Sequence, residues 1–123
     1  EYAAAQKTLE RIFSFRWADS QQKADALIAL AELKSSQGEA KQAIAYYQRV
    51  FTLYPGVIDA AAKGYLGSAV HLAEIDEPAK AHETLDEFLN RSEFTNTLQF
   101  QEAKSLLENL SDKNNSSIEK GGE

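Results

Sequence analysis

The sequence predicts an all-α fold of about six antiparallel helices, arranged as helical hairpins in a solenoid (an α-α superhelix). The composition favours helix, because alanine, leucine and glutamate are abundant while there are only two prolines and six glycines. Apolar residues recur at steps of three and four, the spacing of one helix face. A single 38-residue offset aligns these apolar positions along the chain, which indicates a repeat architecture.

The 38-residue offset superposes small and large apolar residues in the same order. The aligned sets are Ala5, Ala43 and Ala81, then Leu9, Tyr47 and Leu85, then Ile12, Val50 and Phe88. A second series aligns Leu27, Tyr65 and Ala103. Each predicted helix therefore has a counterpart in another unit. Because the turns inside each unit are short, the paired helices must pack antiparallel, and successive hairpins must stack.

The expected helices span residues 2–15, 21–37, 39–54, 58–75, 77–91 and 96–110. Asp19 is placed to cap the second helix, with Gln22 completing a capping box. Gly38 can adopt the left-handed conformation that ends a helix, and Pro55 interrupts the third helix. Asp76 is expected to cap the fifth helix, which has a proline in its first turn.

The expected organisation is one repeat domain over residues 1–110, followed by a tail. It comprises a half repeat over 1–19, full repeats over 20–57 and 58–93, and a capping helix over 94–110. The capping helix has a polar side made by Gln101, Lys104, Ser105, Glu108 and Asn109, opposite Leu98, Ala103, Leu106, Leu107 and Leu110. Residues 111–123 contain a single large apolar residue, so this segment is expected to be disordered.

Composition and charge narrow the function classes. The absence of cysteine excludes disulfides and thiolate metal sites, and no apolar run approaches the roughly 20 residues of a membrane span. The net charge is -6, and residues 56–110 carry ten acidic and four basic side chains. This charge repels nucleic acid and anionic membranes, and it favours a basic or apolar protein partner. The compartment is left open by these features.

The segment from residue 24 to residue 55 resembles the tetratricopeptide repeat (TPR). The matching residues are Ala31, Gly38, Ala43, Tyr47, Val50 and Pro55. The next unit keeps Tyr65, Ala69, Ala81, Leu85 and Phe88 but has Asp76 and Glu93 where the family has glycine and proline. The 38-residue unit is longer than the family's usual repeat of about 34 residues. The longer unit resembles bacterial envelope members, which favours the periplasm or cell envelope over the cytoplasm.

The resemblance implies a protein–protein interaction scaffold whose concave surface is lined by the first helix of each hairpin. The matching groove positions are Asp25, Ile28, Glu32, Lys63, Leu66, Val70 and Lys104. The lysine and asparagine set with which some members hold a peptide's C-terminal carboxylate is missing, which argues against binding of chaperone tails. Packing of this strip against neighbouring repeats is the alternative interpretation.

No residue pattern indicates catalysis, a cofactor or a metal. His71 and His82 fall on different expected helices without carboxylates at ligand spacing, and no glycine-rich phosphate loop or nucleophile motif is present. The acidic residues from Asp76 to Glu93 fit either a basic partner or a solvated helix face. Trp17, beside Phe13 and Phe15, fits either an exposed contact or packing between repeats.

The leading interpretation is therefore a binding module belonging to a longer, bacterial protein, and not an enzyme. Two alternatives remain. In the first, the chain is the C-terminal end and cap of a repeat array and self-associates through its exposed first helix. In the second, it is an accessory domain of an enzyme whose catalytic part lies elsewhere.

Overall fold

The computed structural model describes residues 2–15 and 18–121, with side chains up to residue 112. This part of the chain contains no strand; its elements are α1 (Tyr2–Ser14), α2 (Ser20–Ser36), α3 (Ala40–Leu53), α4 (Ile58–Glu74), α5 (Pro78–Leu89), the 3-10 helix η1 (Ser92–Phe94) and α6 (Leu98–Gly121). The all-α prediction is confirmed. The first five helices begin and end within two residues of the expected positions.

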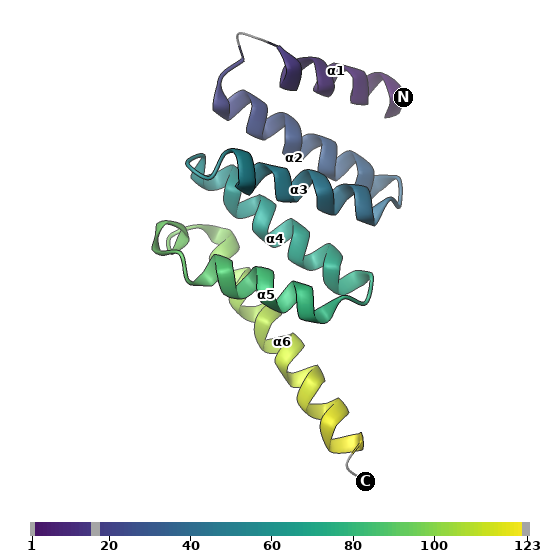
Figure 1. The fold of residues 1–123 in the computed structure, drawn as a ribbon, viewed down its shortest axis with the longest axis vertical. Helices are drawn as coiled ribbons and strands as arrows, with labels where there is room; N and C mark the ends of the chain where they lie inside the picture. The colour runs from purple at the N-terminus through teal and green to yellow at the C-terminus, as the bar shows by residue number, and fades with distance from the viewer. Residues whose placement is uncertain (1, 16–17, 122–123) are drawn as a thin grey trace.

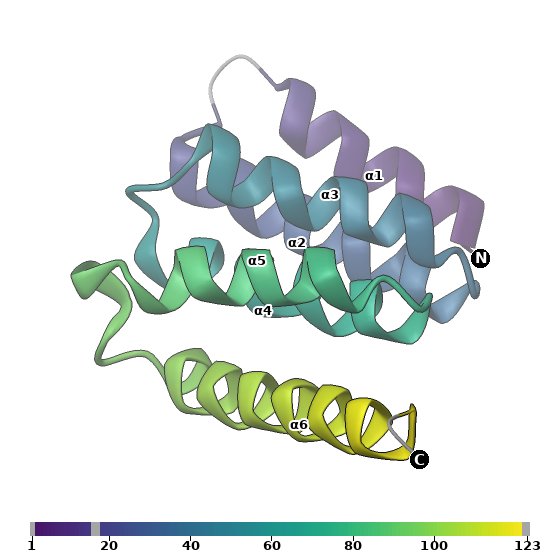
Figure 2. The ribbon, with the colours of Figure 1, turned by 60° about the horizontal axis from the view of Figure 1, so that its bottom comes forward.

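Each α-helix packs against the next one in the sequence, and α4 contacts α2, α3, α5 and α6. Figure 1 shows the helices following one another along the long axis, with α1 at one end and α6 at the other. Figure 2 shows the same order from a view turned by 60°, with α6 beyond α5 and α4. Because α2 packs on α4 and α4 packs on α6, these three helices form a connected row.

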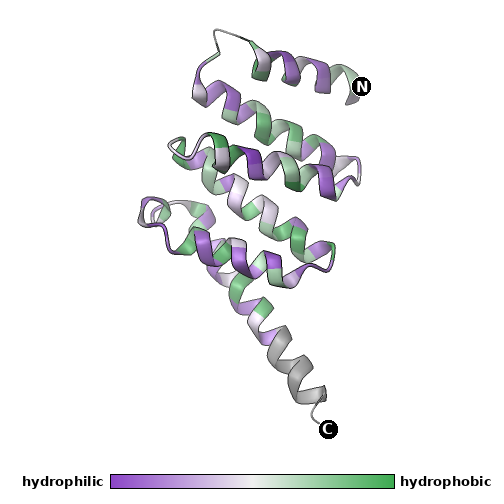
Figure 3. Ribbon diagram, in the orientation of Figure 1, coloured by the Kyte–Doolittle hydropathy of each residue, from purple (hydrophilic) through white to green (hydrophobic). Residues whose placement is uncertain are grey.

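Apolar side chains form two core clusters. One joins α2, α3 and the start of α4, and Leu9 and Phe13 of α1 pack against it. The other joins α4, α5, η1 and α6 around Tyr65, whose ring stacks on Phe51 with 3.9 Å between the ring centroids. Figure 3 shows apolar and hydrophilic residues alternating along α3 and α5, as expected for helices with one buried side.

Two of the predicted helix starts are confirmed by the structure. Asp19 accepts a hydrogen bond from the backbone N–H of Gln22 at 2.8 Å, and the Gln22 side chain accepts one from the Asp19 backbone at 2.9 Å. This is the expected capping box, which satisfies two N–H groups that have no partner inside the helix. Pro78 is in the first turn of α5, also as expected.

The prediction that Asp76 caps α5 is wrong. The N-cap position of α5 is Glu77, which makes no capping hydrogen bond through its side chain. Asp76 instead has a φ of 63°, and the equivalent Gly38 has a φ of 76°. Both residues therefore end the preceding helix in the left-handed conformation, for which glycine is the favoured residue.

The ends of α2 and α4 have the same backbone hydrogen bonds at equivalent repeat positions. After α2, the N–H groups of residues 37, 38 and 39 donate to the carbonyls of residues 33, 35 and 34 at 3.1, 3.0 and 2.9 Å. After α4, the N–H groups of residues 75, 76 and 77 donate to residues 71, 73 and 72 at 3.1, 3.2 and 2.9 Å. In both turns the carbonyls of the last helical turn find partners, which a helix end requires.

The connection between α5 and α6 contains η1, which the sequence did not predict. Phe94 of η1 is almost fully buried, with 5.0 Å between its ring centroid and that of Phe88. The α6 backbone then continues as helix to Gly121, whereas the composition predicts disorder from Ser111. Extending an existing helix fixes one residue per hydrogen bond, so extension into a polar segment is much easier than starting a helix there.

Candidate interaction surface

The seven residues expected to line a groove lie on neighbouring helices. Asp25, Ile28 and Glu32 are on α2, Lys63, Leu66 and Val70 are on α4, and Lys104 is on α6. Since α2 packs on α4 and α4 on α6, the helices that carry these residues are adjacent. Within α2 and within α4 the three positions are spaced by three and four residues, so they share one helix face.

The exposed members of this set are its charged ones. Asp25, Glu32, Lys63 and Lys104 are exposed, while Leu66 and Val70 are half-buried. Ile28 is only 7% exposed, because it packs into the cluster formed by α2 and α3. The strip therefore offers a partner mainly charged side chains of both signs, with two partly covered aliphatic side chains between them.

Glu32 and Lys104 each interact with an aromatic residue nearby. Burial raises the pKa of the Tyr47 hydroxyl above 10.0, and the negative charge of Glu32 raises it further. The ammonium of Lys104 lies 5.0 Å from the centroid of the Phe100 ring, within the range of a cation–π interaction.

His71 and Ser35 form a polar contact between α4 and α2 that sequence reasoning missed. His71 Nδ1 is 2.8 Å from the backbone oxygen of Gly67, and Nε2 is 2.8 Å from Ser35 Oγ. A carbonyl oxygen only accepts, so Nδ1 carries the proton and Nε2 of the neutral ring accepts from the Ser35 hydroxyl. We interpret the contact as structural, because it joins the last turns of α2 and α4 and the His71 side chain is only 8% exposed.

The acidic residues of α5 and the following turn are partly paired on the surface. Arg91 lies 3.3 Å from Glu87 and 4.0 Å from Glu93, and His82 lies 3.3 Å from Asp86. All of these side chains are exposed, and pairs in such positions contribute little to stability. Partial pairing of this kind is typical of a solvated helix face.

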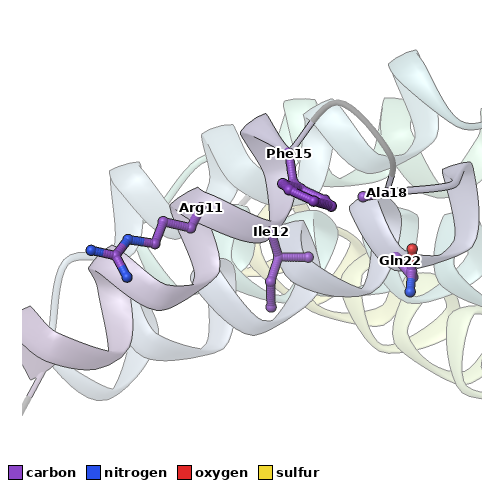
Figure 4. A pocket seen from close by; sticks show the side chains of 5 residues that line it. All are labelled: Arg11, Ile12, Phe15, Ala18 and Gln22. Atoms are coloured by element: carbon purple, nitrogen blue, oxygen red, sulfur yellow. The ribbon is translucent and has the colours of Figure 1, made fainter.

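A different surface, between α1 and α2, contains two adjoining pockets of about 380 and 340 Å³. Both are lined by Ile12 and Gln22. Figure 4 shows the Phe15 ring reaching towards Ala18, while Arg11 extends away from Gln22. Further lining residues of the second pocket are Leu9, Asp25 and Ala26. Together the two pockets form the α1/α2 groove.

The α1/α2 groove adjoins a large share of the exposed apolar side chains. Tyr2, Ile12 and Phe15 are exposed at this end of the molecule, and Phe13 is half-buried. Trp17, which the sequence grouped with Phe13 and Phe15, lies outside the described residues. The sequence indicates an unpaired apolar side of the first helix, but it does not predict the groove.

Among the side chains described, those of residues 2–15 and 18–112, no three histidine, aspartate or glutamate residues lie close enough together to hold a metal ion. No helix of the described chain has the length and apolarity to cross a membrane. Comparisons with protein-family models, curated proteins and solved structures found no match to this chain.

Proposed function

We propose that this chain is a TPR-like helical-hairpin solenoid that serves as a protein–protein interaction scaffold. The recurring helix end carries the proposal: three backbone hydrogen bonds and a left-handed residue follow α2 and recur after α4 at the 38-residue offset. Matching alanines at Ala43 and Ala81 are fully buried in α3 and α5, as a repeated packing unit requires.

The proposed partner is a basic or apolar protein segment that binds the strip on α2, α4 and α6. Asp25 and Glu32 give the α2 part of the strip two exposed negative charges, and the chain as a whole carries -6. These two acids and the negative charge of the whole chain attract a basic segment to the α2 part of the strip over a distance of about 10 Å at moderate salt, while Lys63 and Lys104 place positive charge on its α4 and α6 parts. Leu66 and Val70 supply partly covered apolar surface beside them.

The test is selection from a random peptide library on the intact chain, followed by binding measurements with charge-reversal variants. We expect basic or apolar peptides to be enriched, and Glu32→Lys to weaken their binding at least fivefold. The matched control is Glu83→Lys, which reverses an exposed glutamate on α5 outside the strip. Failure to enrich any peptide, or equal effects of the two variants, would contradict binding at this strip.

A second candidate function is the end of a larger repeat array. It is favoured by the different character of the two ends of the described chain: Ile12 and Phe15 are exposed near α1, whereas α6 turns polar residues outwards. The exposed polar residues of α6 include Gln101, Lys104, Ser105, Glu108 and Asn109. Leu98, expected on the apolar side, is 81% exposed at the start of α6. Under this second function, light scattering should show a mass above 13.6 kDa that falls when Ile12 is replaced by aspartate.

A further inference from the structure

The packing inside the chain shows what covers the apolar side of its α3 and α5 helices. In α3, Ala43 and Val50 are fully buried, and the helix packs against α2 on one side and α4 on the other. In α5, Ala81 and Phe88 are fully buried, and the helix packs against α4 and α6. Each of these helices is therefore covered both by the helix before it and by the helix after it.

Helix α1 corresponds to α3 and α5 by the 38-residue offset, but within the described residues it packs mainly against α2, the helix that follows it, and no described helix precedes it. Leu9 and Phe13 face the core cluster of α2 and α3. Ala5, the counterpart of Ala43, is exposed, and Ile12, the counterpart of Val50, is 38% exposed. The side of α1 that a preceding helix covers in α3 and α5 is thus open in the described chain.

The α1/α2 groove lies where that covering helix would sit. Helix α2 packs on α3 and also contacts α4, and Val50 and Ala60 belong to the cluster that it forms with them. The 38-residue offset relates Val50 to Ile12 and Ala60 to Gln22, the two residues shared by both pockets. The groove is therefore the repeat counterpart of the surface of α3 and α4 on which α2 packs.

We propose that the α1/α2 groove binds an amphipathic helix with an alanine- and leucine-rich face, supplied by a partner polypeptide. The internal interface defines this chemistry, because α2 meets its neighbours through Ala24, Leu27, Leu30 and Ala31, which are at most 1% exposed. Small residues let helix backbones approach closely, and leucines fill the remaining space. Arg11 and Asp25 at the groove favour one acidic and one basic residue flanking the apolar face of the bound helix.

A second copy of the chain could offer only its own α1 as the occupant, and the exposed large apolar residues there are Tyr2, Ile12 and Phe15 and not leucines. The apolar faces of α2 and α4 are already buried, and the exposed side chains of α6 are mostly polar. The proposal is independent of the strip on α2, α4 and α6, with which the groove shares only Asp25. The variants that test the two surfaces therefore differ, and either surface can fail without the other.

The direct test uses a labelled peptide of residues 20–36, capped at both ends, as the probe for the intact chain. We expect saturable binding by fluorescence anisotropy, and a peptide of the same composition in scrambled order should not bind. Ile12→Asp should weaken binding at least tenfold, because it places a charge in the apolar groove. The matched control, Leu98→Asp, adds the same charge at an exposed leucine of α6 and should change affinity less than twofold.

An isolated peptide of this length is only marginally helical, so a covalent version supplies the second measurement. A copy of residues 20–38 placed directly before Glu1 reproduces the spacing between α2 and α3. We expect the melting temperature to rise by at least about 4 °C, which corresponds to roughly 1 kcal/mol for a domain of this size, and Ile12→Asp to abolish the rise.

Three results would overturn the proposal. The first is no rise in melting temperature on grafting, and the second is equal peptide binding by the Ile12→Asp and Leu98→Asp variants. The third is a stable dimer of the unmodified chain that Ile12→Asp dissociates and that the peptide does not displace, since the occupant would then be a second copy. Far-UV circular dichroism of both variants checks that each remains folded.

Discussion

The imidazole of His71 accepts a hydrogen bond from the Ser35 hydroxyl, with 2.8 Å between Nε2 and Oγ. The other ring nitrogen donates to the carbonyl of Gly67 at 2.8 Å, so both polar atoms of a side chain that is only 8% exposed have partners. This contact joins the last turns of α2 and α4 directly.

Replacing Ser35 with alanine should destabilise the chain by about 1 kcal/mol, because Nε2 loses its donor. The measurement is urea unfolding monitored by circular dichroism. Ser36→Ala is the matched control, since the Ser36 hydroxyl bonds only to the Glu32 carbonyl of its own helix. Equal free energies of unfolding for the two variants would show that the contact with His71 contributes nothing.

Replacing Gly64 with alanine should destabilise the contact between α3 and α4. An added Cβ would lie 2.7 Å from the Tyr47 backbone oxygen and 3.1 Å from Val50 Cβ, so the two helices would have to separate. Overpacking costs about 1–3 kcal/mol and outweighs the gain of about 1 kcal/mol in helix propensity. Thermal unfolding should show a lower melting temperature. Gly56→Ala, with no atom within 4 Å of the added Cβ, should leave the melting temperature nearly unchanged.

Asp76 and Gly38 both have a positive φ, so adding a glycine at one position and removing the glycine at the other should change stability in opposite directions. Asp76→Gly should stabilise the chain by about 0.5–1 kcal/mol, because glycine adopts a φ of 63° without steric cost. Gly38→Ala should destabilise it by about 1 kcal/mol for the same reason. Guanidinium unfolding of both variants is the measurement. A loss of stability in Asp76→Gly would indicate that the carboxylate has a role beyond the turn.

Alkaline pH should reduce stability through two buried tyrosines. Burial raises the pKa of Tyr47 and Tyr65 above 10.0; Glu32 adds to the effect at Tyr47, and Glu87 adds to it at Tyr65, where Arg91 partly opposes it. The folded chain therefore keeps protons that the unfolded chain loses near pH 10. The contribution of these two tyrosines to stability should be constant below that pH and fall as pH rises through the raised values. A Tyr47→Phe, Tyr65→Phe double variant should show a smaller fall in urea unfolding measured from pH 9 to 12.

Periodic features of the chain can be predicted from the sequence, but contacts between distant residues cannot. The spacing of alanines and large apolar residues predicts the helices closely, and Asp19 with Gln22 is a reliable local signal. The role of Asp76 is harder to predict because an acid before a proline resembles a cap, whereas its backbone ends the previous helix. The contact of His71 with Ser35 depends on how α2 and α4 pack, which no local pattern encodes.

For the strip and for the α1/α2 groove as well, local sequence patterns predict which residues are involved, but not how the packing of distant residues shapes the surface. Repeat position places the seven strip residues on three adjacent helices, yet it does not predict that Ile28 is covered by core packing. The α1/α2 groove forms where α1 packs on α2, beside the side of α1 that no described helix covers. The exposed apolar side of the first helix follows from the sequence, but the shape of the groove depends on how α1 and α2 pack.

The packing of each helix against the next one in the sequence also affects how fast the chain should fold. Most contacts join helices that follow one another in sequence. Forming such contacts costs little loop-closure entropy. Helical proteins with mostly local contacts fold in microseconds to milliseconds. Local opening should start where burial is least. Helix α1 has no fully buried residue, so its amides should exchange with solvent first, and protection should rise towards α4 at the centre of the stack.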